Sequence, residues 1–288
     1  MTKFLINNNE KIIQCFIKNL KDELSFPKIS EVNYFVLKKY YYQWYKNFSL
    51  MRQYYYMERL KPLVKLISSH RAKHILDIGC GVGSEAILCA LLESKVLGVD
   101  LSQERIECAK ERKTYYERMI KRKLDLEFQT KNFFRLNLTD KFDLTWMNEV
   151  IHHIEPPLEA LKRAYYFLKP NGYIVISDAN AFNPFVQAEL LLKRGFKFYH
   201  QIPDPRTGQM VLYGNEKVLT SGMVKAMLEK AGFRQINILW RGGFLPTTFI
   251  PTMVQEKYFQ EIKKIEKFLV KLPIFRNFAK GYNILAQK

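Results

Sequence analysis

The segment HILDIGCGVGSEA (residues 74–86) constrains the fold more than any other part of this chain. A short apolar run, expected to be a strand, enters a turn with glycine at positions 79, 81 and 83 and continues into a helical pattern. Glycine tolerates positive φ and lets backbone amides approach a ligand closely. The N-terminus of the following helix adds partial positive charge. The segment therefore predicts a strand, loop and helix that cradle a nucleotide.

Short apolar runs alternate with helical segments from residue 73 to about residue 178. The expected strands are 74–78, 95–99, 125–129, 142–147 and 173–177, and the expected helices are 83–92, 103–122 and 157–168. Strands separated by helices of this length pair in parallel through right-handed crossovers. Further along we expect a helix at 221–233, capped by Ser221 and ended by Gly232, and strands at 234–240 and 282–288. The pattern predicts an α/β fold with a doubly wound, mostly parallel sheet.

Three regions follow from this pattern. Residues 1–70 form an N-terminal helical segment or lid, residues 71–245 form the main domain with a substrate-side insertion at 178–215, and residues 246–288 supply a helix and the final strand. The aromatic stretch 39–67 is expected to be helical. Its Tyr/Trp run could close over a ligand, stack on nucleobases or pack on the sheet.

The chain is strongly basic, with 46 Lys and Arg against 28 Asp and Glu, a formal net charge of +18. Such a balance favours nucleic acid, anionic lipid surfaces or acidic substrates, and plain solubility accounts for it equally well. No apolar run approaches the roughly 20 residues of a membrane helix. The polar start MTKFLINNNEKIIQ does not resemble a secretory signal, so we expect a cytoplasmic location. The cysteines, which lack close pairing, are expected to be reduced and mostly buried.

The details of the turn favour one class of nucleotide. A dinucleotide loop of the form G-x-G-x-x-G would place its last glycine at position 84, where this chain has Ser84. Asp77, just before the first glycine, would repel a pyrophosphate but suits the α-ammonium of a sulfonium amino-acid cofactor. Asp100 ends the next expected strand, where a carboxylate can accept both ribose hydroxyls. These residues together predict a sulfonium nucleoside as the ligand.

Four successive segments resemble the motifs of class I S-adenosylmethionine-dependent methyltransferases of the small-molecule and lipid type. They are LDIGCGVGSEA, LGVDLS, FDLTWMNEVIHHI and LKRAYYFLKPNGYIVISDA, and the resemblance covers residues 70–180 well and 215–240 moderately. It implies a Rossmann-like, seven-stranded sheet whose last strand runs antiparallel, with the cofactor across the carboxyl ends of the first strands. An N-terminal helical extension and an inserted and C-terminal helical cap complete the expected fold.

The resemblance also implies which residues bind S-adenosylmethionine. The loop contributes Asp77, Gly79, Cys80, Gly81 and Gly83, Asp100 binds the ribose, and Leu101 packs on the adenine. Asn132 and Phe133 stand where the family often has a Gly-Asp pair, so an amide would replace the carboxylate that receives the adenine amino group. Met147 and Asn148 are expected beneath the methionine part. Tyr45 and Arg52 of the lid are expected near the cofactor's carboxylate.

The segment NEVIHHIEPP brings Glu149, His152 and His153 next to the expected cofactor, as candidates to accept a proton from the methyl acceptor. Imidazole suits this role near neutral pH, although either ring could instead position the acceptor or simply pack. Loops that grip a planar exocyclic amine carry N-P-P-[YF] or D-P-P-Y, which this chain lacks. We expect no metal, because the sequence does not show ligands that would come together.

These observations favour methyl transfer from S-adenosylmethionine to a small-molecule, lipid-linked or sugar-type acceptor, at oxygen. Two alternatives stay open: an RNA methyltransferase that uses the basic surface, and a non-catalytic protein that keeps the cofactor fold. Nucleic acid is the less favoured partner, because no RNA-binding appendage is recognisable. The segment 254–272 has apolar residues along one face and lysines opposite, so it could cap the acceptor pocket, touch an anionic membrane surface or pack on the domain.

Overall fold

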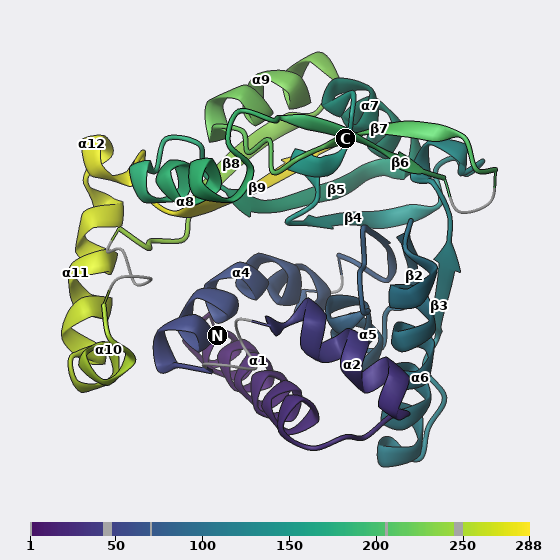
Figure 1. Ribbon diagram of the computed structural model, residues 1–288, viewed down its shortest axis with the longest axis horizontal. Coiled ribbons are helices and arrows are strands. Elements are labelled where there is room, and N and C mark those ends of the chain that lie inside the picture. The colour runs from purple at the N-terminus through teal and green to yellow at the C-terminus, as the bar shows by residue number, and fades with distance from the viewer. Residues whose placement is uncertain (1, 43–47, 70, 205–206, 245–249) are drawn as a thin grey trace.

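The computed structural model describes residues 2–42, 48–69, 71–204, 207–244 and 250–288. Its centre is a seven-stranded sheet in the order β3-β2-β1-β4-β5-β9-β8 (Figure 1). The strands are β1 (His74–Ile78), β2 (Lys95–Asp100), β3 (Leu126–Thr130), β4 (Phe142–Asn148), β5 (Leu168–Ala179), β8 (Arg234–Trp240) and β9 (Gly281–Gln287). The first five are parallel, and β9 runs antiparallel to both β5 and β8. The predicted class, sheet and antiparallel last strand are confirmed.

Helices cover both faces of the sheet (Figure 1). On one face lie α5 (Ser84–Leu91) and α6 (Gln103–Ile120), with the N-terminal helices α1 (Thr2–Ser25), α2 (Glu31–Tyr40) and α4 (Leu50–Ser68). On the other lie α7 (Pro157–Phe167) and α9 (Ser221–Lys230). Neighbouring residues of a strand face opposite cores: Trp146 joins the first and Met147 the second. This two-sided burial explains why the central strands are rich in apolar residues at successive positions.

The structure corrects the expected helix boundaries around the aromatic stretch and α9. Instead of one helix over 39–67, α2 ends at Tyr40 and α4 begins at Leu50, where the Ser49 hydroxyl accepts a hydrogen bond from the Arg52 amide. Thr220, not Ser221, caps α9, since its hydroxyl accepts from the Met223 amide. Tyr54 and Tyr56 of α4 are buried in the core, which supports packing as their role.

The C-terminal half contains more regular structure than the sequence predicted. The insertion holds α8 (Pro184–Arg194) and a β-hairpin of β6 (Tyr199–Pro203) and β7 (Met210–Gly214). The helix expected at 254–272 is broken at Tyr258 into α10 (Thr252–Lys257) and α11 (Phe259–Lys271), followed by α12 (Pro273–Arg276). Among the described residues, η1 (Phe133–Arg135) and η2 (Ile151–His153) are short 3-10 helices. The described cysteines are unpaired, and all but Cys15 are buried.

Gly83 is closely packed, whereas Gly208, which also has positive φ, is not. Both Gly83 and Gly208 have positive φ, of 79° and 67°. A methyl group at Gly83 would lie 2.5 Å from Cζ of Phe128 and 2.9 Å from Cβ of Ala109, whereas one at Gly208 meets nothing within 4 Å.

We therefore expect Gly83→Ala to lower the free energy of unfolding by more than Gly208→Ala. Positive φ costs alanine about 1–2 kcal/mol at either site, and overpacking adds about 1–3 kcal/mol at Gly83. Urea unfolding of the two variants measures the difference. Equal losses would show that the contact of the loop with Phe128 is not tight.

Candidate active site

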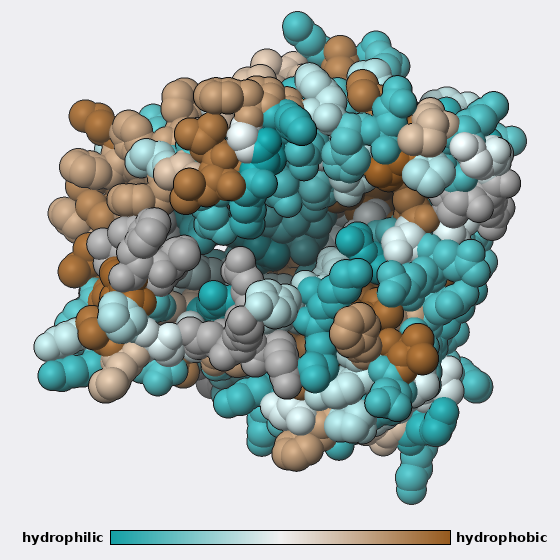
Figure 2. Space-filling view, in the orientation of Figure 1, coloured by the Kyte–Doolittle hydropathy of each residue, from teal (hydrophilic) through white to brown (hydrophobic). Residues whose placement is uncertain are grey.

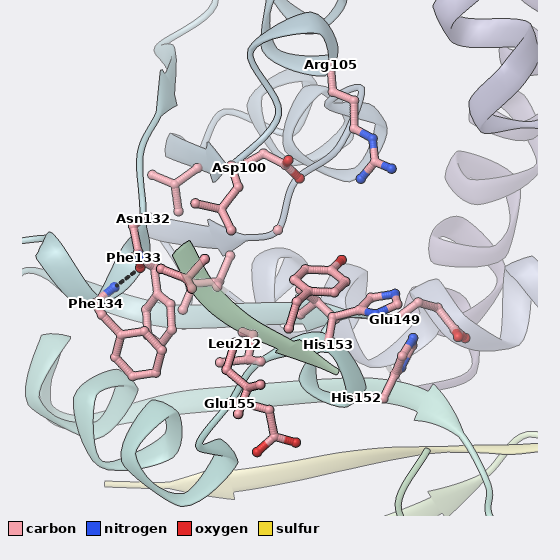
Figure 3. A pocket seen from close by; sticks show the side chains of 18 of the residues that line it. Asp100, Arg105, Asn132, Phe133, Phe134, Glu149, His152, His153, Glu155 and Leu212 are labelled. Carbon is pink, nitrogen blue, oxygen red and sulfur yellow. Dashed lines mark hydrogen bonds between the residues drawn. The ribbon is translucent and has the colours of Figure 1, made fainter. Parts of the chain in front are cut away.

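A cavity of about 760 Å³ lies at the carboxyl ends of β1, β2 and β4, beside the β6–β7 hairpin (Figure 3). This is where ligands bind in open α/β sheets, and the volume is that of a small-molecule site. Six of the residues expected to bind the cofactor line it: Gly79, Asp100, Leu101, Asn132, Phe133 and Asn148. The hairpin, which the sequence did not predict, adds Val211, Leu212 and Tyr213 to the wall.

The glycine loop and the end of β2 form one hydrogen-bonded unit. Gly79, Gly81 and Gly83 all have positive φ, as the turn requires. Asp100 accepts the Gly81 amide through Oδ2 at 2.9 Å and the Ser102 amide through Oδ1 at 2.8 Å. Each carboxylate oxygen can accept a second hydrogen bond. Asp100 can therefore hold the loop and receive ribose hydroxyls at the same time.

Asp77 also bears on whether this site fits S-adenosylmethionine. Its side chain is buried beneath the loop, and within the described part of the chain its Oδ2 has no hydrogen-bond partner. Burial raises the pKa of the Asp77 carboxyl well above its usual range, and the nearby Glu85 and Asp100 raise it further. A buried acceptor in a surplus of negative charge suits a cationic ligand group. The ammonium and sulfonium of S-adenosylmethionine fit this environment.

A buried arginine that sequence reasoning missed holds the loop through two hydrogen bonds. Arg112 of α6 is fully buried and donates from Nη1 to the Val82 carbonyl at 2.6 Å and to the Ser84 hydroxyl at 2.8 Å. Its Nε donates to Glu23 of α1 at 2.7 Å. The N-terminal helix is thus tied to the loop through a buried ion pair, which needs these hydrogen bonds to offset its desolvation.

The N-terminal segment meets the cavity, but not through the residues expected. Tyr45 lies outside the described residues, and Arg52 lines neither this cavity nor its neighbour. The structure instead brings Tyr40 to the glycine loop, where a methyl group at Gly81 would lie 2.5 Å from its hydroxyl. Arg59 of α4 lines a second cavity of about 440 Å³, which shares Tyr40, Asn148 and Glu149 with the first. Arg59, not Arg52, lines this second cavity, and the placement of Arg52 near the cofactor's carboxylate stays a prediction.

Five other expected cofactor residues do not line the cavity: Asp77, Cys80, Gly81, Gly83 and Met147. Cys80 and Met147 are buried in the two hydrophobic cores, and Gly83 packs against Phe128. Asn132 does line the cavity, and its Oδ1 accepts the Phe134 amide at 3.0 Å (Figure 3). That bond caps η1 and fixes the amide at the cavity wall.

The two histidines lie together in η2 and have different environments. His152 Nδ1 lies 2.7 Å from Asp178 Oδ1, while His153 Nδ1 lies 2.8 Å from the Gly214 carbonyl and its ring stacks on Tyr213. Burial would lower the pKa of His152, but the carboxylates of Asp178, Glu149 and Glu216 outweigh it and raise the pKa to about 9. Burial, with the charge of His152, lowers the pKa of His153 to about 3. Nε2 of both rings takes no part in these two contacts, and that of His152 lies 3.8 Å from Glu216 Oε2.

Glu149 does not fit the role of proton acceptor that the sequence suggested. Its Oε1 accepts from Arg59 Nη2 at 2.6 Å and from Arg241 Nη2 at 3.3 Å. Burial raises the pKa of Glu149, but the two arginines outweigh it and bring the pKa down to about 2. A carboxylate held ionised in this way is a weak base. Glu149 instead joins α4 to the end of β8 across the site.

We expect Glu149→Gln to lower the free energy of unfolding at pH 7 by about 2 kcal/mol, because both arginines lose their ionic partner. The folded pKa lies below the unfolded value of about 4.3, so the contribution is complete above pH 5 and fades as the pH falls toward 2. Urea unfolding at pH 7 and pH 4 measures this. The exposed Glu159→Gln serves as control, and a pH-independent difference would contradict the ion-pair explanation.

The stated reason for expecting no metal needs correction. Ligand atoms of His152, His153 and Glu216 lie within 4.8 Å of one another, as do those of Glu149, His152 and Asp178. The fold thus brings Asp178 and Glu216, which are distant in sequence, close to the two histidines. The absence of a metal stays a prediction.

A Rossmann-like sheet with a glycine cradle and a carboxylate at the end of β2 defines a nucleotide-cofactor protein. A family model described as a methyltransferase domain matches residues 69–232, and the chain belongs to this family. The fold is that of S-adenosylmethionine-dependent methyltransferases: a crystal structure of one from Archaeoglobus fulgidus superimposes with a TM-score of 0.51 at 20% identity, covering 80% of this chain and 91% of that one. The predicted family is confirmed.

Two groups of curated proteins are similar in sequence. A ubiquinone biosynthesis O-methyltransferase of Haemophilus ducreyi is 32% identical over 114 residues, 38% of this chain and 46% of that protein. Phosphoethanolamine N-methyltransferase 3 of Arabidopsis thaliana is 28% identical over 124 residues, 42% of this chain and 24% of that protein. The chain spans less than half the length of either relative.

Proposed function

We propose that this protein transfers a methyl group from S-adenosylmethionine to an oxygen of a small or lipid-linked acceptor. The observation that carries the proposal is the position of His152 in the cavity that Gly79, Asp100 and Asn148 also line. A site that held the cofactor alone would not need a carboxylate-oriented imidazole at its wall. The similarity to O-methyltransferases of ubiquinone biosynthesis supports an oxygen acceptor.

Each residue has a defined task in this reaction. The bound cofactor supplies a methyl group on a positively charged sulfur, which is already activated for in-line displacement. Asp100 at the cavity wall would hold the ribose of the cofactor, and the buried Asp77 would supply negative charge for its ammonium. Asp178 orients His152, whose Nε2 would take the proton of the acceptor hydroxyl as that oxygen is methylated, and the cofactor would leave as S-adenosylhomocysteine. Aligning the two reactants supplies most of the rate enhancement.

Calorimetric titration tests the cofactor half of the proposal. We expect S-adenosylhomocysteine to bind with a dissociation constant near micromolar and NAD not to bind. Tight binding of NAD without binding of S-adenosylhomocysteine would overturn the proposal.

The acceptor half is tested by offering two probes at equal cofactor concentration, a polyprenylated catechol and phosphoethanolamine. We expect formation of S-adenosylhomocysteine with the catechol. Turnover of phosphoethanolamine alone would replace oxygen by nitrogen as the acceptor atom. Methylation of bulk RNA, with strongly salt-dependent binding, would favour the RNA alternative.

A further inference from the structure

The side of the molecule formed by α8, α11 and α12 exposes an unusual number of large apolar side chains. Leu192 and Phe196 are 85% and 81% exposed, and Ile274 is 75% exposed. We call this surface the apolar face and define it by Phe182, Phe185, Leu191, Leu192, Phe196, Phe198, Ile265, Phe268, Ile274, Phe275 and Phe278. Monomeric soluble proteins rarely expose contiguous apolar patches larger than a few hundred Å². A patch of this kind indicates a binding surface.

The two parts of the apolar face are joined, although about 80 residues of sequence separate them. The side chain of Asn183, at the start of α8, donates to the Phe278 carbonyl at 2.7 Å. Asn180 donates in the same way to the Asn277 and Ala279 carbonyls. Figure 2 shows the resulting brown surface at the upper left, over α8 and α12, next to the hollow at the centre of the molecule. The start of α8 and the segment that follows α12 are therefore adjacent.

Positive charge borders this face. On α11 the exposed Ile265 and Phe268 are flanked by Lys264, Lys267 and Lys271. At the end of α8, Lys193, Arg194 and Lys197 are neighbours in sequence of Leu192 and Phe196; Lys193 pairs with Glu189 at 3.2 Å, and Arg194 donates to the Gly195 carbonyl at 2.9 Å. Apolar side chains at the centre with Lys and Arg at the rim are the pattern of helices that lie in the interface of an anionic membrane. A protein partner or a second copy would need matching acidic groups at the same positions.

We propose that the apolar face docks on the surface of an anionic lipid bilayer, with the phenyl and aliphatic side chains entering the headgroup boundary and the lysines contacting lipid phosphates. No helix in the described part of the chain is long and apolar enough to span a bilayer, so the contact is peripheral. The charge complementarity of the rim selects lipid over a second copy of the same basic chain, whose like charges would repel.

This surface is connected to the active-site cavity by a short stretch of chain. The segment from Phe196 leads directly into β6, where His200 lines the cavity. A bilayer on the apolar face would hold the mouth of the site close to acceptors dissolved in the lipid. The docking proposal itself does not depend on the proposed methyl transfer, because it concerns a surface outside the catalytic residues.

Vesicle flotation of the full chain tests the proposal without any acceptor. We expect binding to vesicles of phosphatidylcholine with 30% phosphatidylglycerol and at least tenfold weaker binding to pure phosphatidylcholine. The double variants Leu192→Glu/Phe196→Glu and Phe268→Glu/Ile274→Glu should each weaken binding to the anionic vesicles at least tenfold. Lys264→Glu/Lys267→Glu should weaken it severalfold at low salt and less at 0.5 M NaCl, where charges are screened.

Matched controls distinguish loss of binding through the apolar face from misfolding of the variant. Val32→Glu on α2 replaces a side chain that is 75% exposed outside the apolar face, and it should leave vesicle binding unchanged. Unaltered binding of S-adenosylhomocysteine by every variant shows that the fold and the cofactor site persist. Loss of vesicle binding with Val32→Glu, or equal binding to neutral and anionic vesicles, would overturn the proposal. So would absence of vesicle binding together with a dimer, seen by sedimentation, that the Phe268→Glu/Ile274→Glu variant dissociates.

Discussion

Asp100→Ala is expected to weaken binding of S-adenosylhomocysteine at least about 100-fold. The carboxylate has two tasks, because it fixes the Gly81 and Ser102 amides at 2.9 and 2.8 Å and offers its remaining lone pairs to the ribose. Two hydrogen bonds to a charged group are worth about 1.5–3 kcal/mol each, and each 1.4 kcal/mol is tenfold in affinity. Calorimetric titration measures the loss directly.

Two further variants show whether the loss of affinity comes from the charge of Asp100. Asp100→Asn keeps one acceptor oxygen for the loop but loses the charge, so its affinity should lie between wild type and Asp100→Ala. Asp125→Ala removes an exposed aspartate just before β3 and should leave affinity unchanged. If Asp100→Ala bound S-adenosylhomocysteine as tightly as Asp125→Ala, the ribose would not be held by the end of β2, and the assignment of the cradle would be wrong.

The sheet and the cradle could be predicted from the sequence because their signals are local. Each central strand is rich in apolar residues, and the glycines, Asp77 and Asp100 occur within 24 residues at spacings that the turn itself dictates. The hairpin of β6 and β7 gave no such signal. Its strands are exposed and mix polar with apolar residues, and its position is fixed by distant contacts, such as the bridge between Ile154 and Tyr213.

The positions of the candidate proton-transfer residues could be predicted in part for the same reason. His152 and His153 follow β4 directly, so their position at the carboxyl edge of the sheet follows from the topology. Asp178 also ends a strand and could have been found by the same argument, since β5 lies next to β4. Arg59 and Arg241 could not, because their pairing with Glu149 joins residues about 90 positions apart in the sequence through tertiary packing.

The rate of methyl transfer is expected to rise about tenfold per pH unit between pH 7 and pH 9, and then to level off. Asp178, with Glu149 and Glu216, holds the pKa of His152 at about 9, so at pH 7 about 1% of the molecules carry the neutral imidazole that can accept a proton. His153, whose pKa is about 3, is neutral throughout this range and would give a flat profile.

Substitutions show which of the two histidines accepts the proton. His152→Gln should lower kcat by about 100-fold or more, the usual contribution of a general base, whereas His153→Gln should lower it less and keep the pH dependence. Asp178→Asn should move the inflection of the profile toward pH 6.5, because the largest charge that raises the pKa is gone. NMR titration of the His152 ring follows the same pKa without an acceptor. A ring that titrates below pH 7 in the wild-type protein, or a flat profile that His152→Gln leaves flat, would remove His152 from the proton-transfer step and leave it a positioning residue.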